Sequence, residues 1–156
     1  MIQKVVLVAS LILMGSCSKP DFQDSNGNGV YLKELNQKWL IVNYWATWCG
    51  PCIREIPELN ELSQEYSEEL NLIGVDFDHP DPTELVAHMK KMKIEFRVLS
   101  TEPAEILNIE IPMILPTTYV FEPGGKLVKQ LGGPQTKEGL LKLMGLDSDG
   151  ERTEQF

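Results

Sequence analysis

The chain has 156 residues, of which 42% are hydrophobic and 24% are charged, and its formal net charge is −9 at pH 7. This length suffices for one ordinary domain but not for two, and the composition is that of a globular protein and not of a disordered or fibrous one. Nucleic-acid binding requires clustered lysine and arginine, so the acidic balance argues against a nucleic acid as partner.

Residues 1–16 have the pattern of an export signal. Lys4 supplies a positive charge, and Val5–Met14 follows as an apolar segment. This segment is too short to cross the apolar layer of a membrane, roughly 30 Å thick, as a helix. Small residues suited to cleavage come directly before Cys17. We therefore expect a signal peptide over residues 1–16.

Cys17 resembles the lipidated cysteine of a bacterial lipobox, which becomes the first residue of the mature chain. Met14 stands where such boxes usually carry Leu, Val or Ile. We expect a lipoprotein of the bacterial periplasm or cell envelope, held to the membrane through a lipid on Cys17. Plain secretion and an uncleaved N-terminal anchor are the alternatives, and all three place the domain outside the cytoplasm.

The first half of the domain alternates strand and helix patterns. Polar, turn-forming residues predict a tether over residues 17–29, and a short strand is expected over residues 30–35. The apolar run of residues 40–45 predicts a buried strand, and residues 72–77 predict a second one. Between these strands, apolar residues every three or four positions predict a helix from Cys49 to about Glu69. Its apolar positions are Ile53, Ile56, Leu59, Leu62, Tyr66 and Leu70.

The second half continues the alternation and ends in a hairpin and a helix. Thr83 is the expected N-cap of a helix over residues 84–92. Further elements are a short strand at 96–99, a short helix at 102–108, hairpin strands at 117–122 and 126–131, a closing helix at 136–144 and a polar tail at 147–156. This order predicts an α/β fold with a central mixed β-sheet and helices on both faces.

Cys49-Gly50-Pro51-Cys52 directly follows the first buried strand and opens the first long helix. A helix N-terminus presents unpaired N–H groups and a partial positive charge, which stabilise a thiolate. The thiolate is the nucleophile in disulfide exchange, and the two-residue spacer keeps both sulfur atoms within one helical turn. These residues predict a dithiol/disulfide catalyst.

Metal binding is the alternative interpretation of the two cysteines. Half of a zinc site would need two more ligands, and the chain offers only His79 and His88 with no second Cys-x-x-Cys. Met89 and Met92 beside His88 could indicate copper, but they fall at helical spacing and fit core packing better. We expect no metal.

The sequence resembles the thioredoxin superfamily, and within it the TlpA/ResA-type extracytoplasmic thiol–disulfide oxidoreductases. The resemblance covers about residues 30–146, which it implies to be a thioredoxin-like domain with a thioredoxin fold. The residues that carry it are the run Val42-Asn43-Tyr44-Trp45-Ala46-Thr47-Trp48-Cys49-Gly50-Pro51-Cys52, then Glu55 and Pro57, and Pro116-Thr117-Thr118 before the hairpin. Ile114 departs from the family pattern, which usually has Gly two residues before this proline.

The resemblance implies a role for each cysteine. Cys49 is expected to be the exposed nucleophile that forms a mixed disulfide with the substrate, and Cys52 the buried thiol that resolves it. The Gly50-Pro51 dipeptide matches that of thioredoxin and favours a reductant. The redox-active Cys49–Cys52 disulfide would then be the only redox group, with no added cofactor.

Glu55 lies one helical turn after Cys52, on the same side of the predicted helix. A carboxyl group buried beneath the thiol pair would have a raised pKa and could carry the proton of the resolving cysteine. TlpA/ResA-type proteins have a glutamate at this position, whereas Asn43 replaces the buried acid of thioredoxins proper. The alternative is that Glu55 is one more surface carboxylate.

The resemblance also implies a substrate-binding surface around the motif. Pro116 matches the cis-proline of the family, and the backbone of Leu115 could pair with an extended substrate as an added strand. Gly50 and Pro51 would border this surface, and Trp48 would line it. Trp45 is expected in the core instead.

These inferences combine into a monomeric reductase of protein disulfides in the bacterial envelope. By family analogy, a membrane thiol reductant of the DsbD kind would supply its electrons, and its substrates could include apocytochrome c before haem attachment. A disulfide oxidase or isomerase, and a non-catalytic metal-binding module with the same fold, are the alternatives.

Overall fold

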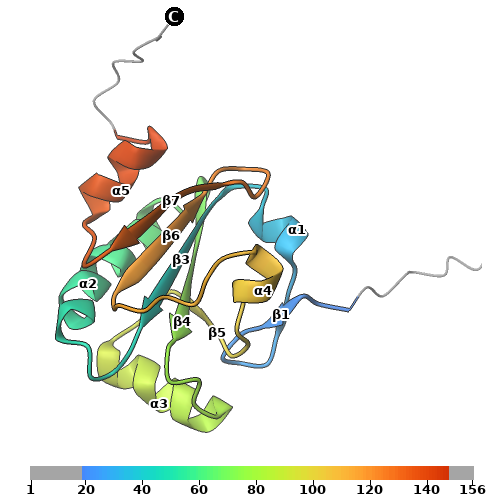
Figure 1. Cartoon of the computed structure of the whole chain (residues 1–156), viewed down its shortest axis with the longest axis vertical. Helices are drawn as coiled ribbons and strands as arrows, with labels where there is room; N and C mark the ends of the chain where they lie inside the picture. Colours follow the sequence, from blue (N-terminus) through green and yellow to red (C-terminus); the bar gives the residue numbers. More distant parts are fainter. Residues whose placement is uncertain (1–18, 148–156) are drawn as a thin grey trace, which may run out of the picture.

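The computed structural model describes residues 19–147, which form a five-stranded mixed sheet with helices around it (Figure 1). The strand order is β5-β4-β3-β6-β7; β3 runs parallel to β4, which is parallel to β5, whereas β6 is antiparallel to both β3 and β7. The strands are β3 (Trp39–Trp45), β4 (Leu70–Asp76), β5 (Arg97–Leu99), β6 (Thr117–Phe121) and β7 (Leu127–Gly132).

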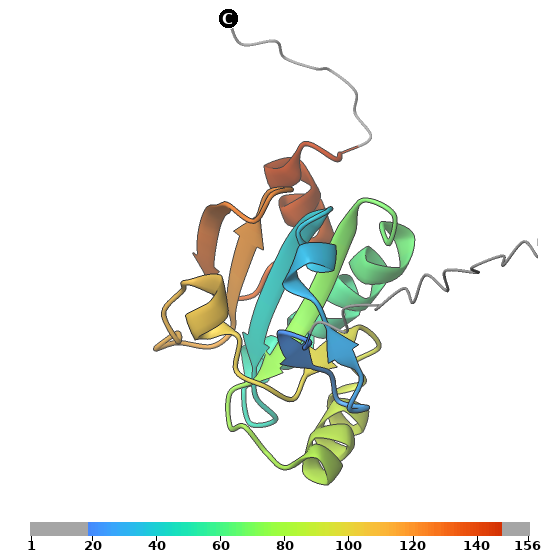
Figure 2. The same ribbon diagram turned by 90° about the vertical axis from the view of Figure 1, so that its right-hand side faces the viewer.

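Helices cover both faces of this sheet, and two clusters of buried side chains separate them. The first cluster joins α2, α3 and α5 to one face, and the second joins α1, α4 and an N-terminal hairpin to the other. Figure 2 shows α1 and the hairpin in front of the sheet and α2 behind it. The helices are α1 (Leu32–Leu35), α2 (Gly50–Glu65), α3 (Pro82–Met92), α4 (Ala104–Leu107) and α5 (Lys137–Met144).

The central strand β3 is apolar on both faces because it is covered on both. Alternate residues enter different clusters: Ile41 and Trp45 pack in the first, and Val42 and Tyr44 in the second. A strand with two covered faces has a continuous apolar run instead of alternation, which is the pattern of residues 40–45. The predicted thioredoxin fold, with its mixed sheet, is confirmed.

The segment that we expected to be a tether is instead largely folded, over the part of it that the structure describes. From Phe22 onward it belongs to the fold: β1 (Phe22–Gln23) pairs with β2 (Gly29–Val30), and Phe22 is only 1% exposed. The Asp24 carboxylate accepts hydrogen bonds from the backbone N–H groups of residues 26 and 28, both at 2.9 Å, and closes the turn. A single aromatic anchor and a side-chain turn therefore order a polar segment that composition alone assigns to a linker.

Two other local predictions were wrong. The strand expected over residues 30–35 is limited to Val30, and α1 follows and buries Leu35. The N-cap of α3 is Asp81 and not Thr83, because an Asp81 carboxylate oxygen accepts from the N–H groups of Thr83 and Glu84 at 2.8 and 3.0 Å. Pro82 then occupies the first turn, where no N–H partner is needed.

The expected signal peptide, the lipidation residue Cys17 and the polar tail from residue 148 onward lie outside the described residues. Within residues 19–147, no helix is both long and apolar enough to cross a membrane.

Replacing the anchor of the hairpin tests whether the N-terminal segment is part of the domain. Phe22→Ala should lower the free energy of unfolding by about 3–5 kcal/mol, because it empties a fully buried aromatic site. Urea denaturation measures the change, and Leu127→Ala, at an exposed position, should cost no more than about 0.5 kcal/mol. If Phe22→Ala lowered the free energy of unfolding as little as the control does, the N-terminal segment would be a tether and not part of the domain.

Candidate active site

The cysteine pair lies where β3 ends and α2 begins. Cys49 is the N-cap residue of α2, Pro51 lies in its first turn, and a disulfide joins Cys49 to Cys52. Cys49 Sγ accepts a hydrogen bond from the backbone N–H of Cys52 at 3.2 Å. The first turn of α2 carries no acidic side chain, so the positive end of the helix acts on the sulfur atoms without a neighbouring negative charge on that turn.

The exposure of Cys49 differs from the expectation. In this disulfide form Cys49 is 4% exposed and Cys52 is fully buried. Both sulfur-bearing residues belong to the first core cluster, because the bond to buried Cys52 holds the Cys49 sulfur against the protein. Cys49 is more exposed than Cys52, as predicted, but the exposed fractions of the two residues differ little.

Glu55 is buried in the second turn of α2, with 1% of its surface exposed. Its Oε1 accepts from Asn43 Nδ2 of β3 at 2.8 Å, and its Oε2 accepts from the backbone N–H of Gln135 at 2.9 Å. Burial raises the pKa of Glu55 to about 7, although these two hydrogen bonds oppose the shift. Glu55 is therefore not a solvated surface carboxylate, and it can gain or lose a proton near neutral pH.

Asn43 connects this carboxyl group to a third element. Its Nδ2 also donates to Thr118 Oγ1 of β6 at 3.1 Å, while its buried Oδ1 has no partner. The unpaired oxygen is an acceptor beside Glu55, which a protonated carboxyl could use if the amide rotates. The sequence analysis identified Asn43 and Glu55 but missed Gln135, because Gln135 contributes a backbone N–H group, which no sequence motif indicates.

Pro116 and the cysteine pair lie at the same end of the sheet. The Leu115–Pro116 peptide bond is cis, as the resemblance implied. Since Thr117 pairs with Tyr44 in the antiparallel β3–β6 ladder, the residues before Thr117 lie at the end of β3 that leads into Cys49. Among the described residues, Leu115 has no hydrogen-bond partner, so its backbone is available to an added strand.

The surface beside the cysteines is apolar. Trp48 is 64% exposed, whereas Trp45 is fully buried, which matches the expected division between docking surface and core. Ile53, one of the apolar positions of the predicted helix, is half-exposed and directly follows Cys52. Ile114, next to Leu115, is exposed as well. Gly50 and Pro51 lie between Trp48 and Ile53, within the first turn of α2.

The two histidines considered as metal ligands both contact carboxylates. His79 Nε2 lies 3.3 Å from Glu102, and His88 Nδ1 lies 2.7 Å from Asp76. Within residues 19–147, no group of three or more His, Cys, Asp or Glu side chains is arranged to hold a metal ion. Met92 is buried in the first core cluster and Met89 packs against it.

Comparison with known proteins agrees with this geometry. The model of the AhpC/TSA family matches residues 17–130. The chain belongs to the AhpC/TSA family. It is 33% identical over 118 residues to the thiol-disulfide oxidoreductase ResA of Bacillus thuringiensis, covering 75% of this chain and 68% of that protein. ResA of Bacillus subtilis is 30% identical over 137 residues, covering 85% of this chain and 75% of that protein.

A solved structure has a similar fold. StoA from Bacillus subtilis matches with a TM-score of 0.64 at 21% identity, covering 79% of this chain and 93% of StoA. The family, the fold and the cysteine pair together make this AhpC/TSA member a thiol–disulfide oxidoreductase related to ResA. Such an enzyme acts on disulfides of its substrates by exchange with its own cysteine pair.

The pKa of Glu55 predicts how stability changes with pH. Raised from 4.5 to about 7, it makes the folded state bind a proton that the unfolded chain has lost. The contribution of this group to the free energy of unfolding should therefore fall between about pH 4.5 and 7, by on the order of 3 kcal/mol.

Glu55→Gln should remove that dependence while keeping a polar group beside Asn43. The stability of the variant relative to wild type should rise across this pH window and stay constant above it. Urea denaturation of both oxidised proteins from pH 4 to 8.5 measures the difference. A difference independent of pH would mean that Glu55 has an ordinary carboxyl pKa.

Proposed function

We propose that this oxidoreductase works as a reductant of protein disulfides outside the cytoplasm, with the Cys49–Cys52 pair as its only redox group and no added cofactor. The observation that carries the proposal is the Cys49–Cys52 pair at the N-terminus of α2, with the carboxyl group of Glu55 buried one helical turn after Cys52. The Gly50-Pro51 dipeptide, shared with thioredoxin, favours the reducing direction.

Two exchange steps would transfer the two electrons. In the dithiol form, the Cys49 thiolate attacks the substrate disulfide, forms a mixed disulfide and releases one substrate thiolate. Cys52 then loses its proton and attacks Cys49 Sγ, which forms the Cys49–Cys52 disulfide and releases the second substrate thiol. The N–H of Cys52 already donates to Cys49 Sγ and would stabilise the thiolate.

Glu55 would serve as the base for Cys52 in the second step. A carboxyl with a pKa near 7 is deprotonated often enough to accept the thiol proton and can return it afterwards. The hydrogen bonds from Asn43 and Gln135 hold the carboxylate form in the protein interior. Both Cys52 and Glu55 are buried, so bulk water has little direct access to this proton.

The substrate would bind as an extended segment across the apolar surface. Leu115 offers its backbone before cis-Pro116, while Trp48 and the first turn of α2 with Gly50 and Pro51 border the site. Peptide recognition by strand addition takes its affinity from the backbone and tolerates different side chains. This arrangement suits protein disulfides of varied sequence.

We further propose that the protein is a monomeric lipoprotein of the periplasm, exported by residues 1–16 and anchored through Cys17. A structural relative, the exposed lipoprotein thioredoxin Etrx1 of Streptococcus pneumoniae, matches with a TM-score of 0.67 at 22% identity, covering 80% of this chain and 97% of that chain. Electrons would come from a membrane reductant of the DsbD kind, and apocytochrome c is one candidate substrate.

The reduction potential of the Cys49–Cys52 pair tests the direction of electron flow. Equilibration with dithiothreitol at pH 7 should give a value nearer that of thioredoxin, about −270 mV, than that of the oxidant DsbA, about −120 mV. A potential near that of DsbA would instead favour the oxidase, and zinc retention by the reduced protein would favour the metal-binding module.

Glu55→Gln should slow thiol–disulfide exchange and flatten the pH profile of the exchange rate around pH 7.

Single cysteine variants test the order of attack. Cys52→Ser should accumulate a mixed disulfide between Cys49 and a disulfide-bonded peptide, because the resolving thiol is absent. Cys49→Ser, the matched control, should form little adduct, since Cys52 is buried. Intact-mass spectrometry of the non-reduced mixture measures both. Equal trapping by the two variants would contradict the assignment of Cys49 as nucleophile.

A further inference from the structure

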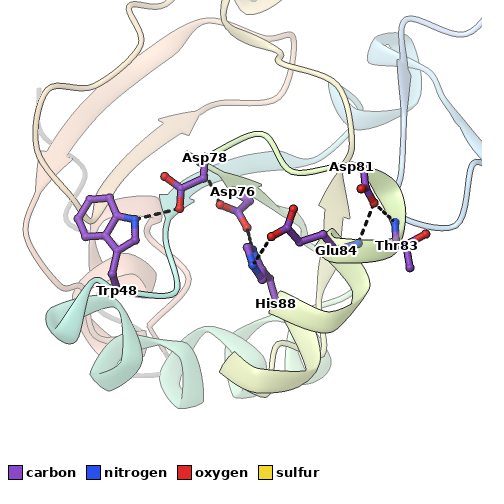
Figure 3. A network of polar contacts seen from close by, with 7 residues as sticks. All are labelled: Trp48, Asp76, Asp78, Asp81, Thr83, Glu84 and His88. Carbon is purple, nitrogen blue, oxygen red and sulfur yellow. Dashed lines mark hydrogen bonds and ion pairs between the residues drawn. The ribbon is translucent and has the colours of Figure 1, made fainter.

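The exposed indole beside Cys49 is held by a side chain from another element. Trp48 Nε1–H donates at 2.9 Å to Asp78 Oδ2, which comes from the loop after β4 (Figure 3). An exposed side chain that is fixed only on binding loses about 0.5–1.5 kcal/mol of rotamer freedom at that moment. A hydrogen bond present in the free protein reduces that loss.

Asp78 is itself held by the buried Asp76, which contacts a partly buried histidine. Its backbone N–H donates to Asp76 Oδ1 at 3.1 Å, and the other Asp76 oxygen lies 2.7 Å from His88 Nδ1 of α3. Asp76 is 2% exposed at the end of β4, so this contact between strand, loop and helix is inside the protein. Figure 3 shows the resulting row of contacts, from Trp48 through Asp78 and Asp76 to His88.

The attachment of α3 does not require this pair. Asp81 caps the helix, and Leu85 and Met92 bury its apolar face in the first core cluster. Burying a carboxylate beside an imidazole is a costly way to add stability, since apolar residues of similar volume usually serve as well. The pair has one further effect that apolar residues could not provide: Asp76 accepts the backbone N–H of Asp78 and so holds the part of the loop from which the Asp78 carboxylate binds Trp48.

We propose that Asp78, supported by the Asp76–His88 pair, is a positioning residue for Trp48 and thereby sets the affinity for protein disulfides docking beside Cys49. This inference rests on the proposed function, because a docking surface for peptide substrates matters only if the cysteine pair exchanges with them. A small disulfide that reaches the sulfur atoms without contacting the indole would not depend on Asp78.

Asp78→Ala tests the proposal in single-turnover reactions of the pre-reduced protein. With a synthetic peptide closed by an intramolecular disulfide, the half-saturating concentration should rise about two- to tenfold, while the limiting rate stays within about twofold. The rate with dipyridyl disulfide and the reduction potential should match wild type. A loss of limiting rate equal to the loss in affinity, or a shifted potential, would overturn the positioning role.

The support from α3 is tested by two replacements of His88 and one matched control. His88→Ala should reproduce the weaker binding, whereas His88→Asn should restore it, because an amide nitrogen can still donate to Asp76. Asp81→Ala removes the N-cap of the same helix and should lower stability by about 1 kcal/mol without changing peptide binding. If Asp81→Ala weakens binding as much as His88→Ala, the effect is loosening of α3 and the proposal fails.

The indole resonance of Trp48, assigned in ¹H–¹⁵N spectra with Trp48→Phe, gives a readout independent of activity. It should shift and exchange faster with water in Asp78→Ala and His88→Ala, but not in His88→Asn or Asp81→Ala. An unchanged resonance in Asp78→Ala overturns the inference. A peptide that wild type does not reduce, while dipyridyl disulfide reacts normally, would instead contradict the proposed function, and the resonance would still decide the role of Asp78.

Discussion

The arrangement of the site depends on the hydrogen bonds that the buried carboxyl group of Glu55 accepts. A carboxylate without partners in a protein interior is strongly unfavourable, so the fold has to bring donors to it. The Asn43 amide comes from β3 and the Gln135 N–H from the segment before α5, two regions far apart in the chain. These donors stabilise the charged form only partly, and the pKa remains raised to about 7. A fully compensated or fully exposed carboxyl would not titrate in the range where thiols exchange.

Acidic side chains are distributed unevenly along α2: they are absent from its first turn and present in its later turns. The first turn has no acid, which leaves the helix N-terminus positive around Cys49. The exposed glutamates come later, and Glu61 and Glu65 bind Lys137 of α5 at 3.2 and 2.9 Å. The hydrogen bonds to these two carboxylates raise the pKa of Lys137. The same helix thus carries the cysteine pair at one end and binds the closing helix at the other.

The sequence predicts those features whose cause is local. A strand covered on both faces has a continuous apolar run, and a cysteine pair at a strand-to-helix junction needs only adjacent residues, so both could be recognised. The hairpin around Phe22 could not be, because one aromatic residue in a polar segment becomes an anchor only when a core across the fold receives it. For the same reason the partners Gln135 and Asp78 were missed: a backbone N–H and a loop carboxylate acquire their roles from residues distant in sequence, here Glu55 and Trp48.

Glu55, one helical turn after Cys52, and Asp78, which binds Trp48, are two acidic residues to which the fold gives opposite surroundings. Glu55 lies in the core, where burial raises its pKa to about 7. Asp78 lies at the surface and binds the exposed indole of Trp48 from the side. They come from different elements and have no common hydrogen-bond partner among the described residues. In the proposed mechanism, proton transfer would therefore depend on the contacts of Glu55 and substrate recognition on those of Asp78, so that a substitution at one of these residues need not disturb the other.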